Sequence, residues 1–345
     1  MGIRIAIILI SLFTAGNLYA DHQSPQNTWT FTFRFENDLF ASTDRNYTNG
    51  IKLSWISPDL DWFSDSHNLP DWSKTVVEKL PFSNLEDRQR NIVFSIGQNI
   101  FTPDNTDTRD LIVDDRPYAG WLYGSAAFHT KNYRHLDTFE IQGGFVGPLS
   151  FAEETQNFIH DLRNIDEAQG WDNQIENEPG LALIYEHKDK IITPQTFSGF
   201  GFDAITHYGA AVGNVFTYAN AGLEMRVGWN LPTDFGTSLI RPGGDTNAPA
   251  DTQDPRFQKV GHGLSLHAFA AATGRLVLRD IFLDGNTFRD SHSVDKEWLV
   301  GDFIVGVSLI YDSLKLSYSQ VFRTKEFEGQ DDSHNFGSIS ISYTY

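Results

Sequence analysis

The feature that most constrains this chain is a strict alternation of aromatic and polar residues near its start. Residues 28–36 read TWTFTFRFE, so Trp29, Phe31, Phe33 and Phe35 alternate with threonine, arginine and glutamate. Successive side chains of a β-strand point to opposite faces, so this segment predicts a strand with one aromatic and one polar face. The last residues of the chain, SISISYTY, repeat the pattern with isoleucine and tyrosine opposite serine and threonine.

The same alternation predicts further strands between these two. We expect them at residues 50–57, 91–99, 120–130, 136–147, 180–188, 199–212, 216–228, 263–279, 298–311 and 314–324. With the first and last segments this makes about twelve strands, and the protein is predicted to be all-β.

The first twenty residues predict a secretory signal peptide. Arg4 precedes an apolar run over residues 5–15, and Ala20 is a small residue at the expected cleavage point. The run is shorter than the roughly 18 to 20 residues that a membrane-spanning helix requires. Cleavage after Ala20 leaves residues 21–345 as a single domain, in which no other apolar run is long enough to span a bilayer.

Two architectures accommodate alternating strands: a soluble β-sandwich and a barrel in the outer membrane. The export signal, the aromatic C-terminal strand and strands of about ten residues with aromatic residues near their ends favour the barrel. An exported chain without a helical span crosses a membrane only as a closed barrel, because an open sheet edge leaves backbone groups unpaired in lipid. We therefore predict a transmembrane antiparallel β-barrel in the outer membrane.

Composition limits the partners of the chain. The formal net charge is −19, which argues against a nucleic-acid partner and suits a site that collects a divalent cation. The chain has no cysteine, so its stability comes from packing and backbone pairing and not from disulfides.

Strand order predicts which connections share an end of the barrel. If the N-terminus is periplasmic, the connections at residues 37–49, 100–119 and 148–179 are extracellular. The segment at 58–89 is then a long periplasmic connection, in which we expect a short helix.

The first of the extracellular connections, ENDLFASTDRNYTNG, concentrates carboxylate and amide side chains in little more than a hairpin. A polar turn is the ordinary interpretation, since Asn, Asp and Gly favour turns. The alternative is a cluster of oxygen ligands for calcium. Alternation would send Asn37 and Asp38 to opposite faces, so the backbone must turn there if both serve one site.

The second, IFTPDNTDTRDLIVDDRPYAGW, has Asp114, Asp115 and Arg116 before a proline. It is either a solvated loop with an internal ion pair or a wall of the same site. In the second case Arg116 would bind an anionic substrate group through two hydrogen bonds.

The third contains the stretch SFAEETQNFIHDLRN, which predicts a helix within an extracellular loop. Ser150 and Glu153 have the spacing of a capping box. Residues 151, 158, 162 and 165 form an apolar face, which we expect to rest on the barrel or on lipid chains. Glu153, Gln156 and His160 form a polar row beside it. A single histidine in a helix is more often a bystander than a catalyst, but histidine is the side chain best suited to proton transfer near neutral pH.

Together these segments resemble the family of outer-membrane lipid A 3'-O-deacylases. The resemblance rests on FENDLF and DRNYTNG, on TPD with DDRPYAGW, on GFVGPLSFAEETQNFIH with GWDNQIENEP, and on the terminal strands. These motifs occur in the same order over nearly the whole chain after the predicted signal peptide.

The resemblance implies a twelve-stranded barrel with a calcium-dependent site at its outer end, between the barrel wall and the helix. The family hydrolyses the ester of the 3'-linked acyloxyacyl chain of lipid A. Its functional residues fall here on Asn37, Asp38, Thr48, His160 and Asp166. A tyrosine of the family is replaced by Ala168, and a lysine has no clear counterpart, with Arg109 the nearest candidate. Those departures leave the reaction type unchanged and put the substrate details in question.

From the residues and the resemblance together we expect His160 to take a proton from the attacking water, while Thr48 positions the carbonyl or the water and Asp166 orients the imidazole. A Thr48 acyl-enzyme is the alternative variant. The expected calcium ligands are Asp38, Glu36 and Asp115, and the expected substrate-binding residues are Arg116, Arg45 and Gln156. The expected partners are lipopolysaccharide and the outer membrane, with a monomeric barrel. Two alternative functions remain open: an outer-membrane phospholipase and a non-catalytic, porin-like barrel.

Overall fold

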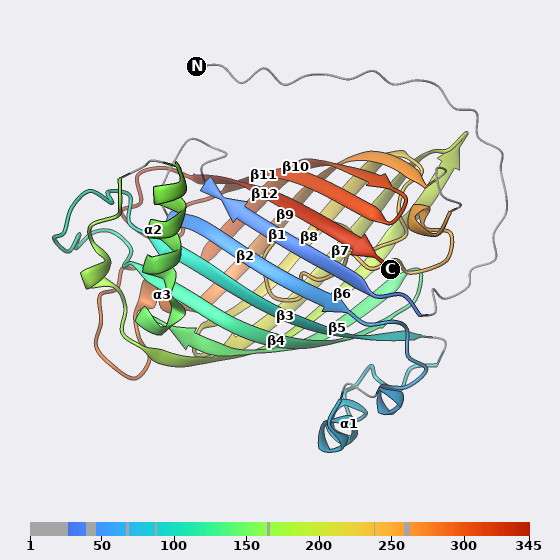
Figure 1. Cartoon of the computed structure of the whole chain (residues 1–345), viewed down its shortest axis with the longest axis horizontal. Coiled ribbons are helices and arrows are strands. Elements are labelled where there is room, and N and C mark those ends of the chain that lie inside the picture. Colours follow the sequence, from blue (N-terminus) through green and yellow to red (C-terminus); the bar gives the residue numbers. More distant parts are fainter. Residues whose placement is uncertain are drawn as a thin grey trace.

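The structure is a computed structural model that describes residues 27–38, 46–66, 69–86, 88–163, 166–237, 239–258 and 263–345. The predicted signal peptide and Arg45 lie outside these residues. Within them, twelve antiparallel strands form a closed barrel in which each strand pairs with the next and β1 pairs with β12 (Figure 1). The predicted fold class is therefore confirmed.

The strands have the following bounds: β1 Thr30–Asn37, β2 Asn46–Ile56, β3 Gln89–Thr102, β4 Ala119–Lys131, β5 His135–Val146, β6 Glu178–Phe197, β7 Phe200–Gly213, β8 Phe216–Trp229, β9 Leu264–Asp280, β10 Leu299–Tyr311, β11 Leu314–Arg323 and β12 His334–Thr344. The α-helices are α1 Asp71–Val77, α2 Ala152–Arg163 and α3 Ile281–Asp284. Each predicted strand coincides with one of these twelve, and the expected helix between β2 and β3 is α1.

The barrel has a polar interior and an apolar exterior. In β1 the side chains of Thr30, Thr32 and Arg34 are buried, whereas the phenylalanines between them are half-buried on the outside. In β12 Ser342 is buried and Tyr343 is 49% exposed. The side chains of Thr32 and Ser342 bond to each other inside the barrel at 2.8 Å. A soluble sandwich would bury the aromatic face instead, so the alternation has the sense expected of a membrane barrel.

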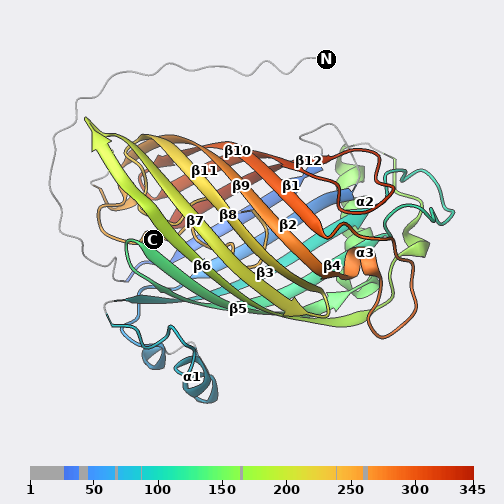
Figure 2. The same ribbon diagram turned by 180° about the vertical axis from the view of Figure 1, so that it is seen from behind.

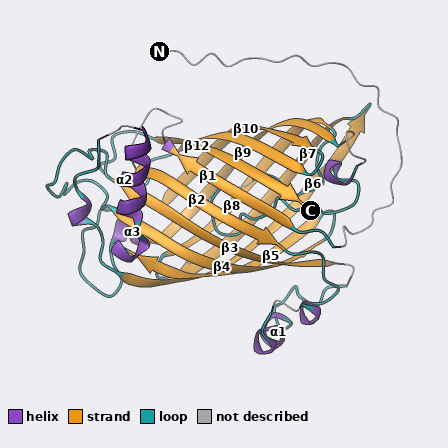
Figure 3. Cartoon of the chain, viewed as in Figure 1, coloured by secondary structure: helices purple, strands orange, loops and turns teal. Residues whose placement is uncertain are grey.

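The two rims of the barrel differ in what they carry. At one rim, here called the helix rim, β1 ends and α2 and α3 lie (Figures 1 and 3). At the opposite rim, the terminal rim, β1 begins, β12 ends and α1 extends to the side of the barrel (Figure 2). Among the described residues, no helix combines the length and hydrophobicity needed to cross a bilayer.

The lumen is filled by the connection between β8 and β9, described over residues 230–237 and 239–258, which folds back into the barrel from the terminal rim (Figure 2). Its Asp245 forms ion pairs with Arg34 and Lys52 of the wall, the latter at 2.6 Å. A second carboxylate, Asp234, pairs with Lys315 at 2.7 Å and with two arginines. Nearer the helix rim a cavity of about 140 Å³ remains. No pattern in the sequence predicted this lumenal segment.

Candidate active site

Helix α2 covers the outside of the barrel wall with the face that carries the histidine. Ala152, Gln156 and His160 recur at every fourth residue and are only 1%, 2% and 3% exposed. Phe151 and Phe158, from the predicted apolar face, are 54% and 62% exposed. Of the two supports expected for the apolar face, barrel or lipid, the barrel is excluded for Phe151 and Phe158. Gln156 and His160 of the polar row pack on the wall instead, while Glu153 is exposed.

The start of α2 also differs from the prediction. A short 3-10 turn, Pro148–Ser150, precedes the helix, and Phe151 adopts a left-handed conformation between the two. The Ser150 hydroxyl donates to the carbonyl oxygen of Gly147 at 2.6 Å, so it does not form a capping box with Glu153. The chain thus makes a sharp corner before the helix begins at Ala152.

Two residues of the wall allow the helix to approach closely. A Cβ atom on Gly120 would lie 2.0 Å from the Ser150 hydroxyl and 2.4 Å from the Ala152 Cβ, so glycine is required for this contact. Gln98 of β3 donates from Nε2 to the Ser150 carbonyl oxygen at 2.6 Å. From this anchor α2 runs across the ends of the neighbouring strands toward β2 and β1 (Figure 1).

Beside α2, the rim of the wall carries buried polar groups on β1, β2 and β3. Asn37 donates from Nδ2 to the Thr48 carbonyl oxygen at 2.8 Å, and the Thr48 and Thr102 hydroxyls bond to each other at 2.7 Å. All three residues are at most 3% exposed. By alternation with the lumenal residues of β1 and β3, Asn37 and Thr102 belong to the outward rows, where a membrane barrel presents apolar side chains to lipid.

The backbone turns after Asn37, as the sequence analysis required for a shared site. β1 ends at Asn37, and Asp38 leaves the extended conformation with a fully buried side chain. Asn37 pairs with Asn49 across β1 and β2, and Asn49 pairs with Ile100 on β3. Ile100 belongs to the same buried cluster as Ala152 of α2, so β3 connects the helix with the polar groups of the first two strands.

The imidazole of His160 is held through one of its nitrogens. Nδ1 lies 2.7 Å from the backbone carbonyl oxygen of Asp166. A carbonyl oxygen only accepts hydrogen bonds, so Nδ1 carries the hydrogen of the neutral ring and Nε2 carries the lone pair. The predicted orienting residue is therefore in contact with the histidine through its backbone, while its carboxylate is on the surface.

Gln156 serves the packing of the segment that follows α2. Its Oε1 accepts a hydrogen bond from the Trp171 indole at 2.9 Å, and the Trp171 ring packs on Tyr118 with 4.9 Å between centroids. Arg109 donates to the Gln169 side chain at 3.1 and 3.2 Å. The second and third predicted loops are thereby joined into one assembly around α2, and Arg109 lies beside the segment that contains the replaced tyrosine position.

Two predicted calcium ligands lie elsewhere. Glu36 faces the lumen, where its carboxylate accepts hydrogen bonds from the Ile240 amide at 2.7 Å and from Ser338 at 3.1 Å. Asp115 accepts from the backbone amides of Asp104 and Arg116, both at 2.7 Å. Burial raises the pKa of Asp115, and those two hydrogen bonds and the charge of Arg116 oppose the rise. Both carboxylates already have structural partners away from Asn37 and Asp38.

Arg116 also points away from the helix, into the helix-rim end of the lumen. Its Nη1 lies 3.2 Å from the Glu326 carboxylate, and its guanidinium stacks over the Phe101 ring at 4.9 Å. Arg116 thus forms an ion pair, but the pair is buried and its partner comes from a distant part of the chain, so the expected internal pair of a solvated loop is wrong.

No group of three or more His, Asp or Glu side chains in the described ranges is arranged to hold a metal ion. The donor types at the end of β1 nevertheless suit a hard cation. Asp38 offers a buried carboxylate and Asn37 an amide oxygen, and calcium prefers six to eight oxygen ligands of these kinds. The described residues thus fit part of a calcium site.

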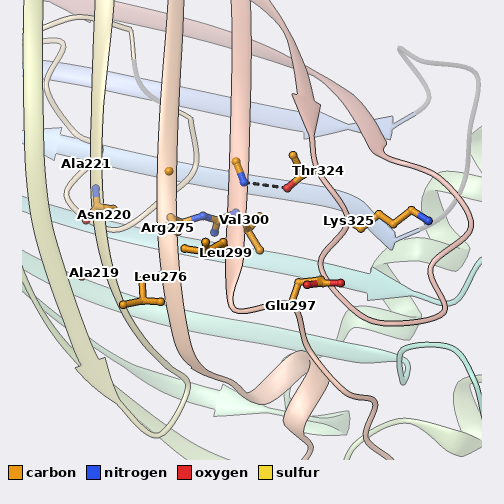
Figure 4. Close-up of a pocket in the computed structure, with 12 residues that line it drawn as sticks. Ala219, Asn220, Ala221, Arg275, Leu276, Glu297, Leu299, Val300, Thr324 and Lys325 are labelled. Carbon is orange, nitrogen blue, oxygen red and sulfur yellow. Dashed lines mark hydrogen bonds between the residues drawn. The ribbon is translucent and has the colours of Figure 1, made fainter.

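A larger hollow, about 710 Å³, lies on a different part of the wall (Figure 4). Small residues of β8, β9 and β10 form its floor, and Glu297 and Lys325 lie at one end of it. None of the predicted site residues lines this hollow, so it is not part of the arrangement around α2.

Thr102 is a residue of this region that sequence reasoning missed. A signal for it existed, because Thr102 interrupts an outward row at the end of a strand where aliphatic or aromatic residues are the rule. The close approach that glycine permits at position 120 could be expected from the sequence, and the structure confirms it, whereas the hydrogen bond of Trp171 across the loop could not.

Comparison with known proteins agrees with this architecture. The sequence profile of the family described as "Outer membrane protein LpxR" matches residues 5–345. The solved structure of LpxR from Salmonella typhimurium superposes with a TM-score of 0.70 at 19% identity, covering 91% of this chain and 99% of that one. No match is found among curated proteins.

Other solved barrels are much less similar. The β-domain of the Bordetella autotransporter BrkA reaches a TM-score of 0.40 at 10% identity, covering 92% of this chain and 98% of its own. The translocator domain of NalP from Neisseria meningitidis reaches 0.37 at 8% identity, with 94% and 89% covered. Because the family profile spans nearly the whole sequence, the chain belongs to the LpxR family of outer membrane proteins.

Proposed function

We propose that this protein is a calcium-dependent lipid A deacylase that hydrolyses the ester of the 3'-linked acyloxyacyl chain. The observation that carries the proposal is the position of His160. It is buried on helix α2, which runs across the outside of the wall toward the strands that carry Asn37 and Thr48, polar residues at a place where a barrel otherwise meets lipid. A site on the outer surface of a membrane barrel is accessible to a lipid without passage through the lumen.

The exposed face of α2 supports a lipid substrate. Phe151 and Phe158 and the preceding Leu149 are between 47% and 62% exposed on the side facing away from the wall. Apolar side chains at a membrane rim are stabilised by acyl chains and not by water. A lipid in the surrounding leaflet therefore meets an apolar surface on the outer side of the helix.

The proposed chemistry begins with Nε2 of His160. It takes a proton from a water molecule whose oxygen attacks the ester carbonyl carbon. When the tetrahedral intermediate collapses, the carbon–oxygen bond to the sugar breaks and the proton returns from the imidazole to the departing alkoxide. The carbonyl oxygen of Asp166 holds the ring during both transfers, and Thr48 is proposed to orient the carbonyl or the water. The Thr48 acyl-enzyme is less favoured, because its hydroxyl is engaged with Thr102.

Asp38 and Asn37 are the residues proposed to hold calcium. When bound, the ion would polarise the ester carbonyl and stabilise the negative charge that develops on its oxygen. Glu36 and Asp115 are left out of this ligand set because both have other partners. The substrate-binding roles expected of Arg45 and Gln156 stay predictions.

The proposed substrate also sets the proposed orientation and state. Lipid A resides in the outer leaflet, so the helix rim would face the cell exterior and the two termini the periplasm. One chain closes the barrel without help from a second, which is consistent with the expected monomer.

Two alternatives were left open by the sequence. The lumenal segment, with ion pairs from Asp234 and Asp245 to the wall, disfavours a porin-like diffusion pore. A phospholipase would use the same ester chemistry, and its substrate differs only in the headgroup and the arrangement of acyl chains.

The test is a comparison of two substrates with one enzyme preparation. Purified, folded barrel is incubated with lipid A and, separately, with phosphatidylethanolamine, with calcium present, and the products are identified by mass spectrometry. We expect loss of the 3'-linked chain from lipid A and intact phosphatidylethanolamine. Release of fatty acid from phosphatidylethanolamine alone would establish the phospholipase instead, and two unchanged substrates would reject the hydrolase proposal.

A further inference from the structure

The connection between β2 and β3 is bound to the outside of the barrel wall. Residues 58–88, here called the terminal appendage, contain α1. Arg90, in an outward row of β3, donates to the carbonyl oxygens of Asp61, Ser83 and Leu85 at 2.6 to 2.7 Å. Its guanidinium also lies 4.5 Å from the centre of the Trp62 ring. One wall residue thus clamps several turns of the appendage.

Aromatic contacts extend this attachment along the wall. Phe63 packs edge-on against Phe128 of β4, with 5.6 Å between ring centroids, and Phe82 stacks on Tyr185 of β6 at 5.8 Å. Ile92 of β3 is fully buried beneath the appendage. These wall positions belong to the outward rows, which would otherwise contact lipid. The appendage therefore occupies space beside the wall at the terminal rim (Figure 1).

The far side of the appendage exposes large apolar side chains in the described structure. Trp72 and Val76 are one turn apart on α1, where they are 75% and 58% exposed, whereas Val77 on the opposite face is buried. Trp62 is another exposed aromatic residue, at 45%. Apolar side chains grouped on one side of a helix indicate a surface that is covered by something other than water.

The position of the appendage along the barrel identifies what covers it. On the same strands the next outward residues toward the middle of the wall are Ile96, Ile141 and Leu183, which are 50%, 39% and 39% exposed. Ile141 and Leu183 are only two residues, about 7 Å, from the last covered position on their strands. The appendage thus borders the apolar band directly, at the level where tryptophan is enriched in membrane barrels.

We infer that α1 is an interfacial anchor whose Trp72 and Val76 insert into the leaflet at the terminal rim, with phospholipid as the ligand. Lys79, an exposed residue in the turn that follows the helix, can extend its ammonium group to the lipid phosphates while its alkyl chain stays in the apolar layer. The continuity of this surface with the apolar band favours lipid over a protein partner. The inference is independent of the proposed catalytic activity, and in the proposed orientation the leaflet is the periplasmic one.

The test uses the absence of cysteine from the natural chain. The Val76→Cys variant is labelled with an environment-sensitive nitrobenzoxadiazole dye and reconstituted in vesicles of phosphatidylethanolamine and phosphatidylglycerol. Lipids carrying a nitroxide high on the acyl chain quench a dye in the membrane, and iodide quenches a dye in water. We expect strong nitroxide quenching and weak iodide quenching at Val76.

Three control variants define the scale. Ile96→Cys, on the exposed wall, gives the lipid limit, and Asp107→Cys, on an exposed loop at the helix rim, gives the water limit. The third variant carries the dye at Lys79→Cys and also has Trp72→Ser and Val76→Ser. Loss of the two apolar side chains should reduce nitroxide quenching toward the level of the Asp107→Cys variant. Heat-modifiable migration shows that its barrel is folded. Quenching at Val76 that matches Asp107, or a dye shielded from both quenchers as by a protein partner, would overturn the inference.

Discussion

At the scale of single residues, the proposed mechanism depends on the different roles of the two ring nitrogens of His160. The Asp166 carbonyl oxygen engages Nδ1, and this contact leaves the basic nitrogen on the side of the ring away from the loop. Because the contact is made by the backbone, it survives substitution of Asp166. The catalytic capacity assigned to this site therefore resides in the imidazole itself.

Replacement of His160 by alanine should lower the deacylation rate by about 10²- to 10⁴-fold, the range ordinarily supplied by a general base. His292→Ala is the matched control, since His292 also bonds to a backbone carbonyl oxygen at the helix rim, that of Asp115. Initial rates on lipid A in detergent micelles measure both. Equal rates in wild type and His160→Ala would remove His160 from the mechanism.

Calcium dependence is the second prediction at this scale. Chelation with EGTA should stop deacylation, and added calcium should restore it, because the ion is proposed to polarise the carbonyl. Asp38→Asn removes a proposed ligand charge and should shift the calcium titration of the rate to higher concentration. Asp71→Asn, at a fully solvated carboxylate on α1, should leave the titration unchanged. A wild-type rate that is indifferent to EGTA contradicts the proposal.

At the scale of elements, the site depends on the fit between α2 and the wall. Gly120 permits the approach of the 3-10 turn and the first residue of the helix, and Gln98 fixes the turn by a hydrogen bond. Without these two contacts, the helix that carries His160 would be free to move away from the barrel.

Gly120→Val should therefore displace α2 and abolish activity while the barrel remains closed. Its Cβ would meet Ser150 and Ala152 at 2.0 and 2.4 Å. Gly124→Ala, on the same outward row of β4, is the control, because its Cβ would meet no atom closer than a carbonyl oxygen at 3.9 Å. Heat-modifiable migration and the deacylation rate are measured for both. Retained activity in folded Gly120→Val would show that close packing of α2 is unnecessary.

The elements also show what could be predicted from the sequence. All twelve strands were found, because a period of two is preserved wherever one face meets the lumen and the other meets lipid. The sequence did not decide whether the apolar face of α2 meets the barrel or lipid, since the apolar residues of a helix at a membrane rim need not face the protein. The prediction that Ser150 forms a capping box with Glu153 was wrong, because its hydroxyl donates to the carbonyl oxygen of Gly147 in the preceding turn.

The lumenal segment and the attachment of the terminal appendage could not be predicted at all. Both depend on contacts between distant parts of the chain, such as Asp245 with Lys52 and Phe82 with Tyr185, for which alternation gives no signal. Of the candidate site, Asn37 and Thr48 are joined by a hydrogen bond, but the neighbouring Glu36 faces the opposite side of the wall.

At the scale of the whole molecule, the lumenal segment makes the stability of the folded barrel depend on pH. Burial alone would raise the pKa of Asp245, but Lys52 and Arg34 outweigh it and hold the pKa well below its ordinary value. The unfolded chain, with an aspartate pKa near 3.9, therefore takes up protons before the folded one. The stabilisation that Asp245 contributes is present above that value and is lost as the pH falls below it.

Wild-type protein should accordingly lose stability as the pH is lowered from about 5 toward 3. Asp245→Asn should be less stable at pH 7, because it leaves two buried cations without their partner, but its stability should fall less steeply, by up to about 1.4 kcal/mol per pH unit. Urea titrations followed by gel mobility at each pH test this, with Asp71→Asn as the exposed control. Parallel pH profiles for wild type and Asp245→Asn would contradict the assigned role.

The central claim is that the surface between α2 and the outer wall removes an acyl chain from lipid A. Its most direct test is the mass of lipid A extracted from Gram-negative cells that produce the wild-type protein or His160→Ala, grown with calcium. We predict lipid A lighter by the 3'-linked acyloxyacyl chain in cells with the wild-type protein and of full mass with folded His160→Ala. Lipid A of full mass in both, with the wild-type barrel folded in the outer membrane, would contradict the account.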